Sequence, residues 1–162
     1  MIKKGDQTSE WISQKVPHGA TIKSLVIPEQ IGYQFIGWFD DADNPFSNSF
    51  PINHDLDVYA HFDLIKYDLM WDLGGHGEIT SPVRRKYTVL DWDSDTITQG
   101  VVPVGYEPTI EFSGWDGNTI PVGTTGDFTF TAKWKTRLYT VTWVNGEIPL
   151  NTLQFEYGHV IQ

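Results

Sequence analysis

The stretch "GYQFIGWF" (Gly32–Phe39) places four aromatic residues and two glycines in eight positions, and "IEFSGWDG" (Ile110–Gly117) repeats its outline. In both stretches apolar residues alternate along the chain before a Gly-Trp pair, as expected of a strand with one buried face. We interpret each glycine as leaving room on the core face for a neighbouring backbone or ring. Trp38 and Trp115, one position out of phase, would then fold over the strand end. They could stack on a ligand, but we favour a packing role because large aromatic residues dominate cores.

Two further pairs of segments match at one common spacing. "HDLDVYAHF" (His54–Phe62) aligns with "GDFTFTAKW" (Gly126–Trp134), and every number differs by 72. "YDLMWDLGG" (Tyr67–Gly75) aligns with "YTVTWVNGE" (Tyr139–Glu147), again with a difference of 72. Two independent matches at one spacing predict a tandem repeat.

This period predicts the organisation of the chain. The boundaries fall near residues 64 and 136, so we expect a first module at 1–64, a second at 65–136 and the truncated start of a third at 137–162. The first strand of the first module is unclear or missing. Each matched segment alternates with period two, which predicts half-buried antiparallel strands. The Asn-Gly of "VNGE" (Val144–Glu147) predicts a two-residue hairpin turn.

Composition limits the functional classes. The aromatic content of 14 % suits β structure. A net charge of −10 disfavours a nucleic acid or an anionic membrane as partner, because phosphate binding requires cations. There is no cysteine, and no apolar stretch long enough to insert into a membrane. The N-terminal sequence lacks the apolar core of a signal peptide, so we expect a secreted protein to contain this chain as a fragment.

Taken in order, these motifs resemble the Listeria–Bacteroides repeat family, the B-repeat type of internalins. The matching elements are "YTVTW", "VPHG" (Val16–Gly19), "GYQFIGWF", "FSGW", "DVYAHF" and "FTAKW". The resemblance implies a β-rich α+β fold of tandem, small, β-grasp-like modules with mostly antiparallel sheets and at most short helices. It also implies an extracellular location on a bacterial cell surface. One departure is Lys86, which stands where the other modules have Gly19 and Gly158.

Residues that could carry chemistry are few. Asp91, Asp93 and Asp95 alternate as in calcium loops, but the glycine and the final glutamate of an EF-hand are absent. A solvated acidic loop is the simpler interpretation, and calcium is kept as a weak alternative. The histidines lack zinc-ligand spacing, and no nucleophile motif is present. We therefore expect no enzyme, no catalytic residues and no cofactor.

Two functional hypotheses remain. The first is a non-catalytic repeat that acts as a stalk or spacer and as an adhesion module. The second is a module that itself binds a host glycan or an extracellular protein, using the aromatic residues outside the alternating core set, Tyr59, Trp92 and Tyr106. Exposure of these three would favour the second hypothesis. The incomplete first module also suggests head-to-tail self-association, in which the hairpin at 138–157 completes a neighbouring molecule.

Overall fold

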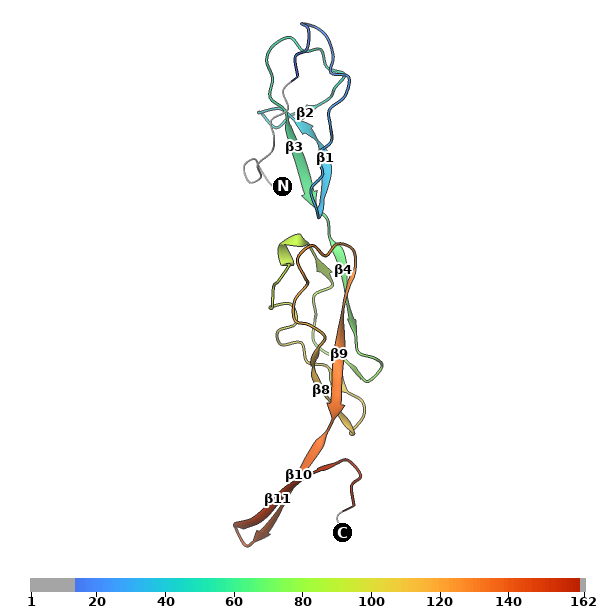
Figure 1. Cartoon of the computed structure of the whole chain (residues 1–162), viewed down its shortest axis with the longest axis vertical. Helices are drawn as coiled ribbons and strands as arrows, with labels where there is room; N and C mark the ends of the chain where they lie inside the picture. The colour runs from blue at the N-terminus through green and yellow to red at the C-terminus, as the bar shows by residue number, and fades with distance from the viewer. Residues whose placement is uncertain (1–13, 161–162) are drawn as a thin grey trace. The chain divides into compact units, whose positions relative to one another are not determined.

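The computed structural model describes residues 14–160 and divides the chain into two compact units, Met1–Lys66 and Tyr67–Gln162. Figure 1 shows the strands of each unit. Each unit is described by itself below. The boundary follows Lys66, at the start of the segment that matches "YTVTW".

Unit 1 contains a three-stranded antiparallel sheet in the order β2-β1-β3. Its long strands are β1 (Tyr33–Phe39) and β3 (Tyr59–Leu64), and β2 (Pro45–Phe46) adds a short edge. β1 pairs along its length with β3, from Tyr33 opposite Leu64 to Phe39 opposite Tyr59. The alternation in "GYQFIGWF" therefore corresponds to a paired strand with one half-buried face.

Unit 2 contains a four-stranded sheet in the order β6-β4-β9-β8. Its strands are β4 (Tyr67–Asp72), β6 (Lys86–Tyr87), β8 (Ile110–Trp115) and β9 (Phe128–Thr136), and a separate pair joins β5 (Gly77–Glu78) to β7 (Val104–Gly105). The central strands β4 and β9 run parallel, and the outer strands pair with them antiparallel (Figure 1).

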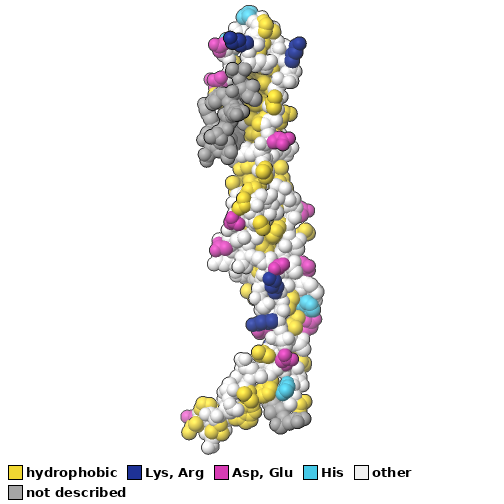
Figure 2. All heavy atoms as spheres, viewed as in Figure 1, with side chains coloured by type: hydrophobic (Ala, Val, Ile, Leu, Met, Phe, Trp, Pro, Cys, Tyr) yellow, Lys and Arg dark blue, Asp and Glu magenta, His cyan; other side chains and the backbone are white. Residues whose placement is uncertain are grey.

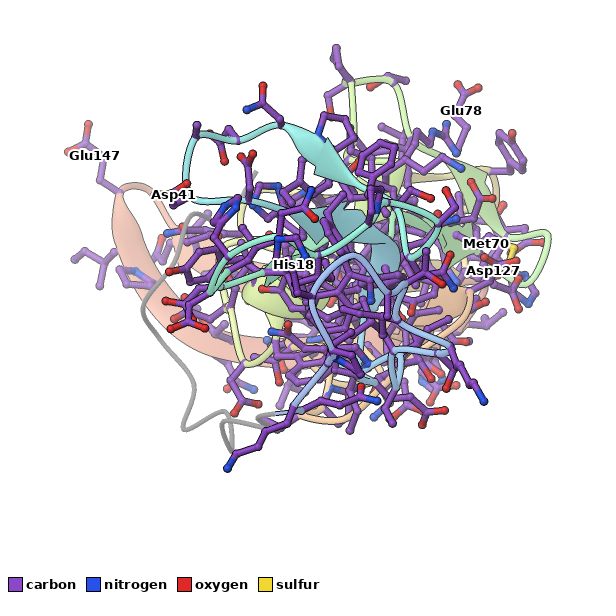
Figure 3. The ribbon with its side chains drawn as sticks, turned by 90° about the horizontal axis from the view of Figure 1, so that it is seen from above. His18, Asp41, Met70, Glu78, Asp127 and Glu147 are labelled. Atoms are coloured by element: carbon purple, nitrogen blue, oxygen red, sulfur yellow. The ribbon has the colours of Figure 1, made fainter. Side chains whose placement is uncertain are left out.

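A hairpin of β10 (Leu138–Asn145) and β11 (Ile148–Glu156) follows this sheet. Its two loop residues are Gly146 and Glu147, one position later than the expected Asn-Gly pair. Gly146 has a φ of 63°, whereas Asn145 stays in the strand, so only the glycine supplies the left-handed conformation that the turn needs. Glu147 projects from this turn (Figure 3).

The hydrophobic core lies in unit 2, where β4, β9 and β8 present their apolar faces. Phe130 and Ile120 are fully buried; Phe128 packs edge to face against Phe130 at 5.1 Å, and the Trp71 ring lies tilted against it at 5.3 Å. The buried members of this cluster are Leu69, Tyr87, Ile97, Trp115, Ile120, Phe130 and Ala132. The alternating residues of β9 supply two of them, as the period-two pattern predicts.

Helical structure is nearly absent. Among residues 14–160, the only helical segment is a 3₁₀ turn, Val89–Asp91, which Thr88 caps through its side chain. The prediction of a β-rich chain with mostly antiparallel sheets and at most short helices is confirmed. The helical component of an α+β fold is reduced to this one turn.

Both Gly-Trp motifs lie at a β-bulge. In β1 the register with β3 shifts between Phe35 and Gly37, and in β8 the register with β9 shifts between Phe112 and Gly114. Gly37 has a φ of 156° and Gly114 a φ of 134°, a region that residues with a Cβ rarely adopt.

The bulge corrects our interpretation of these glycines. A Cβ built on Gly114 meets no atom within 4 Å, and one on Gly37 meets only the Phe39 ring, at 3.2 Å. Room for a neighbour is therefore not the common reason for glycine. The shared requirement is the positive φ that the bulge imposes on the backbone.

The bulge also changes the face on which the tryptophan lies. In a regular strand, residues three apart point to opposite faces. One extra residue reverses this, so Phe35 contacts Trp38 edge to face at 5.6 Å, and Phe112 contacts Trp115 edge to face at 5.2 Å. Each tryptophan then stands opposite an alanine across the ladder, Trp38 opposite Ala60 and Trp115 opposite Ala132. The tryptophan thus packs on the core face and does not fold over the strand end.

Candidate functional site

Trp115, a sequence candidate for ligand stacking, is part of the packed core. Its ring is 7 % exposed and packs edge to face against Trp71 at 4.9 Å. Its Nε1 donates a hydrogen bond to the Val101 carbonyl oxygen at 3.0 Å. With its ring covered and its only donor bonded, this residue offers no surface to a ligand. Trp38 is half-buried against Phe35 in the equivalent position of unit 1.

The three candidate ligand-contact aromatics belong to two different units. Trp92 is half-buried, packs against the core cluster and donates from Nε1 to the Thr124 carbonyl oxygen at 3.0 Å. Tyr59 is half-buried at the start of β3 in unit 1. Tyr106 is 62 % exposed, directly after β7 in unit 2. Of the three, Tyr106 alone presents most of its surface to solvent.

The acidic loop uses one of its three aspartates for local structure. The Asp91 carboxylate accepts a hydrogen bond from the Thr88 backbone N–H at 2.7 Å and forms an ion pair with Arg84 at 2.8 Å. Asp93 has a φ of 54°, and Asp95 is exposed. Within residues 14–160, no three acidic, histidine or cysteine side chains come close enough to hold a metal ion. The loop geometry is that of a capped 3₁₀ turn.

A cleft of about 260 Å³ lies in unit 1, in the loops that follow β1 and β2. Phe46 and Phe50 meet edge to face at 6.1 Å on its wall, and Phe50 is 52 % exposed. The remaining lining residues are Asp40, Asn44, Pro45, Pro51, Ile52, Asn53, His54 and Leu56. Exposed aromatic rings beside side-chain amides are the usual components of small ligand sites.

The polar edge of this cleft is ordered by Asp40. Its carboxylate accepts hydrogen bonds from the backbone N–H groups of Ala42 and Asn44 and from the Asn44 side-chain amide. These bonds, the Asn44 side chain first, hold the pKa of Asp40 below its ordinary value of 3.8. Asp41 follows in the same turn and is exposed (Figure 3). A turn fixed in this way can present Asn44 and Phe46 with little loss of entropy on binding.

Among the described residues of unit 1, His61 is the buried polar one. It is 7 % exposed and stacks on Phe39 with ring centroids 4.1 Å apart. Its Nε2 lies 3.5 Å from an Asp43 carboxylate oxygen, and its Nδ1 has no hydrogen-bond partner among the described residues. In unit 2 the same ladder position, opposite the bulge glycine, holds Lys133, which reaches solvent and pairs with Asp116 at 2.7 Å.

The hairpin carries an uncovered apolar face. One face of β10 presents Tyr139, Val141 and Trp143, and β11 adds Leu153 and Phe155 opposite them. A hollow of about 360 Å³ on this face is lined by Tyr139, Val141, Phe155, Glu156, Tyr157, Gly158 and His159. Apolar side chains gather along the hairpin in Figure 2. In the part of the chain that the structure describes, no third strand pairs with either edge of the hairpin, whereas the unit 2 sheet has four strands.

Sequence reasoning identified the hairpin but missed the cleft. The cleft is built from the stretch 40–56, where Phe46 and Phe50 lie four residues apart in a loop without alternation. No periodic pattern marks such a site. The available signal was the combination of Asp40 and Asn44, which is typical of a side-chain-capped turn.

Comparison with known proteins finds a family whose sequence model matches most of unit 1. The sequence model of the Listeria-Bacteroides repeat domain matches residues 3–61. This segment is therefore similar in sequence to the Listeria-Bacteroides repeat domain. The Gly-Trp motif at its bulge and the closing "DVYAHF" both lie in or beside the matched range, as the resemblance implied.

Two curated relatives extend along most of the chain. Both come from Evansella cellulosilytica. One, named "Putative Gly-rich membrane protein", is 24 % identical over 162 residues and covers 97 % of this chain. The other, named "Putative membrane protein", is 27 % identical over 169 residues and covers 94 %. The chain spans only 18 % and 24 % of their lengths. No solved structure matches.

The Listeria-Bacteroides repeat and these relatives suggest a repeat-containing bacterial surface protein. Within residues 14–160, no helix combines the length and the hydropathy needed to cross a bilayer.

Proposed function

We propose that this chain is a non-catalytic section of a bacterial cell-surface protein, in which small β-grasp-like modules repeat in tandem and act as a stalk and adhesion region. The observation that carries the proposal is the shared bulge. Phe35-Gly37-Trp38 and Phe112-Gly114-Trp115 have the same register shift, the same positive φ at glycine and the same alanine opposite tryptophan. A copied sequence pattern that places the same residues in the same backbone distortion supports a copied module.

The sheet of unit 2 supports the β-grasp-like assignment. Its first and last strands, β4 and β9, are central and parallel, and β6 and β8 flank them antiparallel. The connection between the flanking strands contains the 3₁₀ turn Val89–Asp91. In this proposal unit 2 is a second, diverged copy of the family domain present in unit 1.

A non-catalytic role is supported by what the two units share. The shared positions are aromatic, glycine or alanine, and in unit 2 they form the core. Side chains committed to packing are not available for acid–base or nucleophilic chemistry. The net charge of −10 supports an exposed, soluble section, because mutual repulsion disfavours non-specific association of its surface.

The surface location can be tested on cells that carry the parent protein. We expect antibodies raised against this chain to label intact cells, and protease added outside to remove the label. Label that appears only after the cells are broken would contradict the proposed location.

A second function, direct binding of a host glycan or extracellular protein, is favoured by the cleft of unit 1. Its exposed Phe50 can stack on a sugar ring, and Asn44 and Asn53 can hydrogen-bond to hydroxyl groups. Tyr106, exposed in unit 2, is an independent candidate contact.

Binding of this chain to a panel of glycans and host-matrix proteins separates the two functions. A stalk role alone predicts no saturable binding to the panel. Saturable binding that is lost in Phe50→Ala or Tyr106→Ala would instead establish that this chain itself makes the adhesive contact. Val102→Ala, a change at a residue that is 63 % exposed and outside the cleft, is the matched control.

A further inference from the structure

The first strand of the hairpin, β10, repeats the apolar pattern of β4, whose equivalent residues pack into the core of unit 2. Tyr139, Val141 and Trp143 repeat Tyr67, Leu69 and Trp71 at the 72-residue spacing. In β4, Leu69 is 2 % exposed and Trp71 packs against Phe130 at 5.3 Å. In β10, Trp143 is 36 % exposed.

The partner that buries β4 is the first part of β9. Leu69 stands opposite Phe128 and Trp71 opposite Phe130 in a parallel ladder. β4 uses one edge of β9 in this way, while β8 occupies the other edge from Trp115 to Ile110. The first four residues of β9, Phe128–Thr131, are those paired with β4.

Unit 1 contains the equivalent of this partner, but the segment is not paired. By the 72-residue spacing, Leu56 and Val58 correspond to Phe128 and Phe130, and Ala60 corresponds to Ala132. β9 starts at Phe128, whereas β3 starts at Tyr59, three residues later than the spacing would place it. Residues 56–58 have no strand assignment, and Leu56 is 37 % exposed.

The burial of unit 1 shows the same difference. Among residues 14–160, all eight buried hydrophobic residues of the core belong to unit 2. Among the described residues of unit 1, the equivalent apolar face holds Phe35, Trp38 and Phe62, which are half-buried. β3 is the last strand of its sheet, and its second edge pairs with no described strand.

We propose that the hairpin of one copy of this chain adds to unit 1 of a second copy, with β10 parallel to residues 56–58 as β4 is to β9. The register places Val141 opposite Leu56 and Trp143 opposite Val58. The added strand supplies backbone hydrogen bonds, and alternate side chains enter the half-covered apolar face, which is the general mechanism of strand addition. Because donor and acceptor are different surfaces of one chain, the contact is heterologous and can propagate head to tail.

The first test is the mass of the chain as a function of concentration, measured by sedimentation equilibrium. The proposal predicts a weight-average mass that rises from 18.4 kDa as concentration increases. Trp143→Asp in the donor and Leu56→Asp in the acceptor should each weaken association by more than about tenfold, because each buries a charge in the new interface. Thr142→Asp, on the opposite face of β10, is the matched control and should retain most of the association.

Mixing the two variants gives the sharper test. A Leu56→Asp copy retains an intact hairpin, and a Trp143→Asp copy retains an intact acceptor. Together they can form one contact that cannot propagate, so the mixture should form dimers and stop there. Circular dichroism and urea unfolding of each variant show whether it remains folded, and both altered side chains are substantially exposed in the single chain.

Three results would overturn the proposal. The first is a mass that stays at the monomer value at every concentration. The second is association that survives in both variants, which would assign it to another surface. The third is a mixture of the two folded variants that remains monomeric.

Discussion

β4 and β10 carry the same pattern, a tyrosine, an aliphatic residue and a tryptophan at alternate positions, yet only in β4 do these three residues pack into a core. Tyr67, Leu69 and Trp71 lie against the core of unit 2, and the Trp71 Nε1 donates to the Arg84 carbonyl oxygen at 2.9 Å. Tyr139 and Trp143 remain 40 % and 36 % exposed on the hairpin.

The difference lies in the neighbouring strands. β4 has β6 on one edge and β9 on the other, whereas β10 pairs with β11 along its whole length and with no other described strand. A two-stranded hairpin is marginally stable by itself, and a third strand or a packed layer is needed to bury one face. The repeated pattern therefore specifies a strand, and the third strand determines whether that strand enters a core.

The largest effect that this comparison predicts is on the two tryptophans. Trp71→Ala should lower the free energy of unfolding of unit 2 by about 3 kcal/mol or more, because it leaves a cavity between Trp115 and Phe130. Trp143→Ala should lower it by about 1 kcal/mol or less, because the ring is already partly in water and its ring contact is Phe155 at 6.4 Å.

Urea unfolding followed by far-UV circular dichroism measures both variants under one condition. The chain is kept dilute so that contacts between copies do not contribute. Equal losses of stability in the two variants would show that the hairpin is covered in solution, and the comparison would fail.

A smaller effect is predicted at the bulge that the two units share. Gly114→Ala should destabilise unit 2 by about 1–3 kcal/mol, since alanine is strained at a φ of 134° even though its Cβ has open space. The neighbouring Ser113→Ala, at the extra residue of the bulge, is exposed and should change stability by less than about 0.5 kcal/mol.

Gly37→Ala extends this prediction to unit 1. The new Cβ would also lie 3.2 Å from the Phe39 ring, so the loss of stability should be at least as large as the backbone strain alone would cause. Thermal unfolding of the three variants is the measurement. An unchanged midpoint for Gly114→Ala would mean that the bulge does not require glycine.

The smallest effect concerns the turn of unit 1 and its pH dependence. The folded-state pKa of Asp40 lies below 3.8, so its hydrogen bonds stabilise the turn above that pH and are lost as pH falls through the folded pKa. Asn44→Ala removes the side-chain donor and should raise the pKa of Asp40 toward 3.8, while the backbone N–H bond at position 44 remains. NMR titration of the Asp40 side-chain carboxyl carbon checks this, and an unchanged pKa would assign the shift to the backbone bonds alone.

Much of the fold was predictable because alternation is local. The strands at Tyr33–Phe39, Phe128–Thr136 and Leu138–Asn145 follow from period-two patterns. The resemblance to the Listeria–Bacteroides repeat is confirmed for residues 3–61. The organisation into three modules, with boundaries at 64 and 136, stays a prediction.

The bulge was not predictable from alternation, because one extra residue reverses the faces that alternation assigns. The sequence pattern placed Gly37 and Trp38 correctly in a strand, but we expected the tryptophan to fold over the strand end. The sequence does contain a sign of the bulge, because the tryptophan falls three residues after a phenylalanine and so breaks the alternation. Two residues three apart can share one face of a strand only if one residue between them is inserted. The cleft around Phe50 depends on loop geometry, which no period encodes.

Amide hydrogen exchange of the dilute chain tests the central claim most directly, namely that the same pattern is buried in β4 and uncovered in β10. We predict that the hydrogen-bonded amides of β4, among them the Leu69 N–H that donates to the Arg85 carbonyl oxygen at 2.9 Å, exchange only through unfolding of unit 2. The hydrogen-bonded amides of β10 should exchange much faster, through local opening of the hairpin. Equal protection of the two segments in the monomer would contradict the claim.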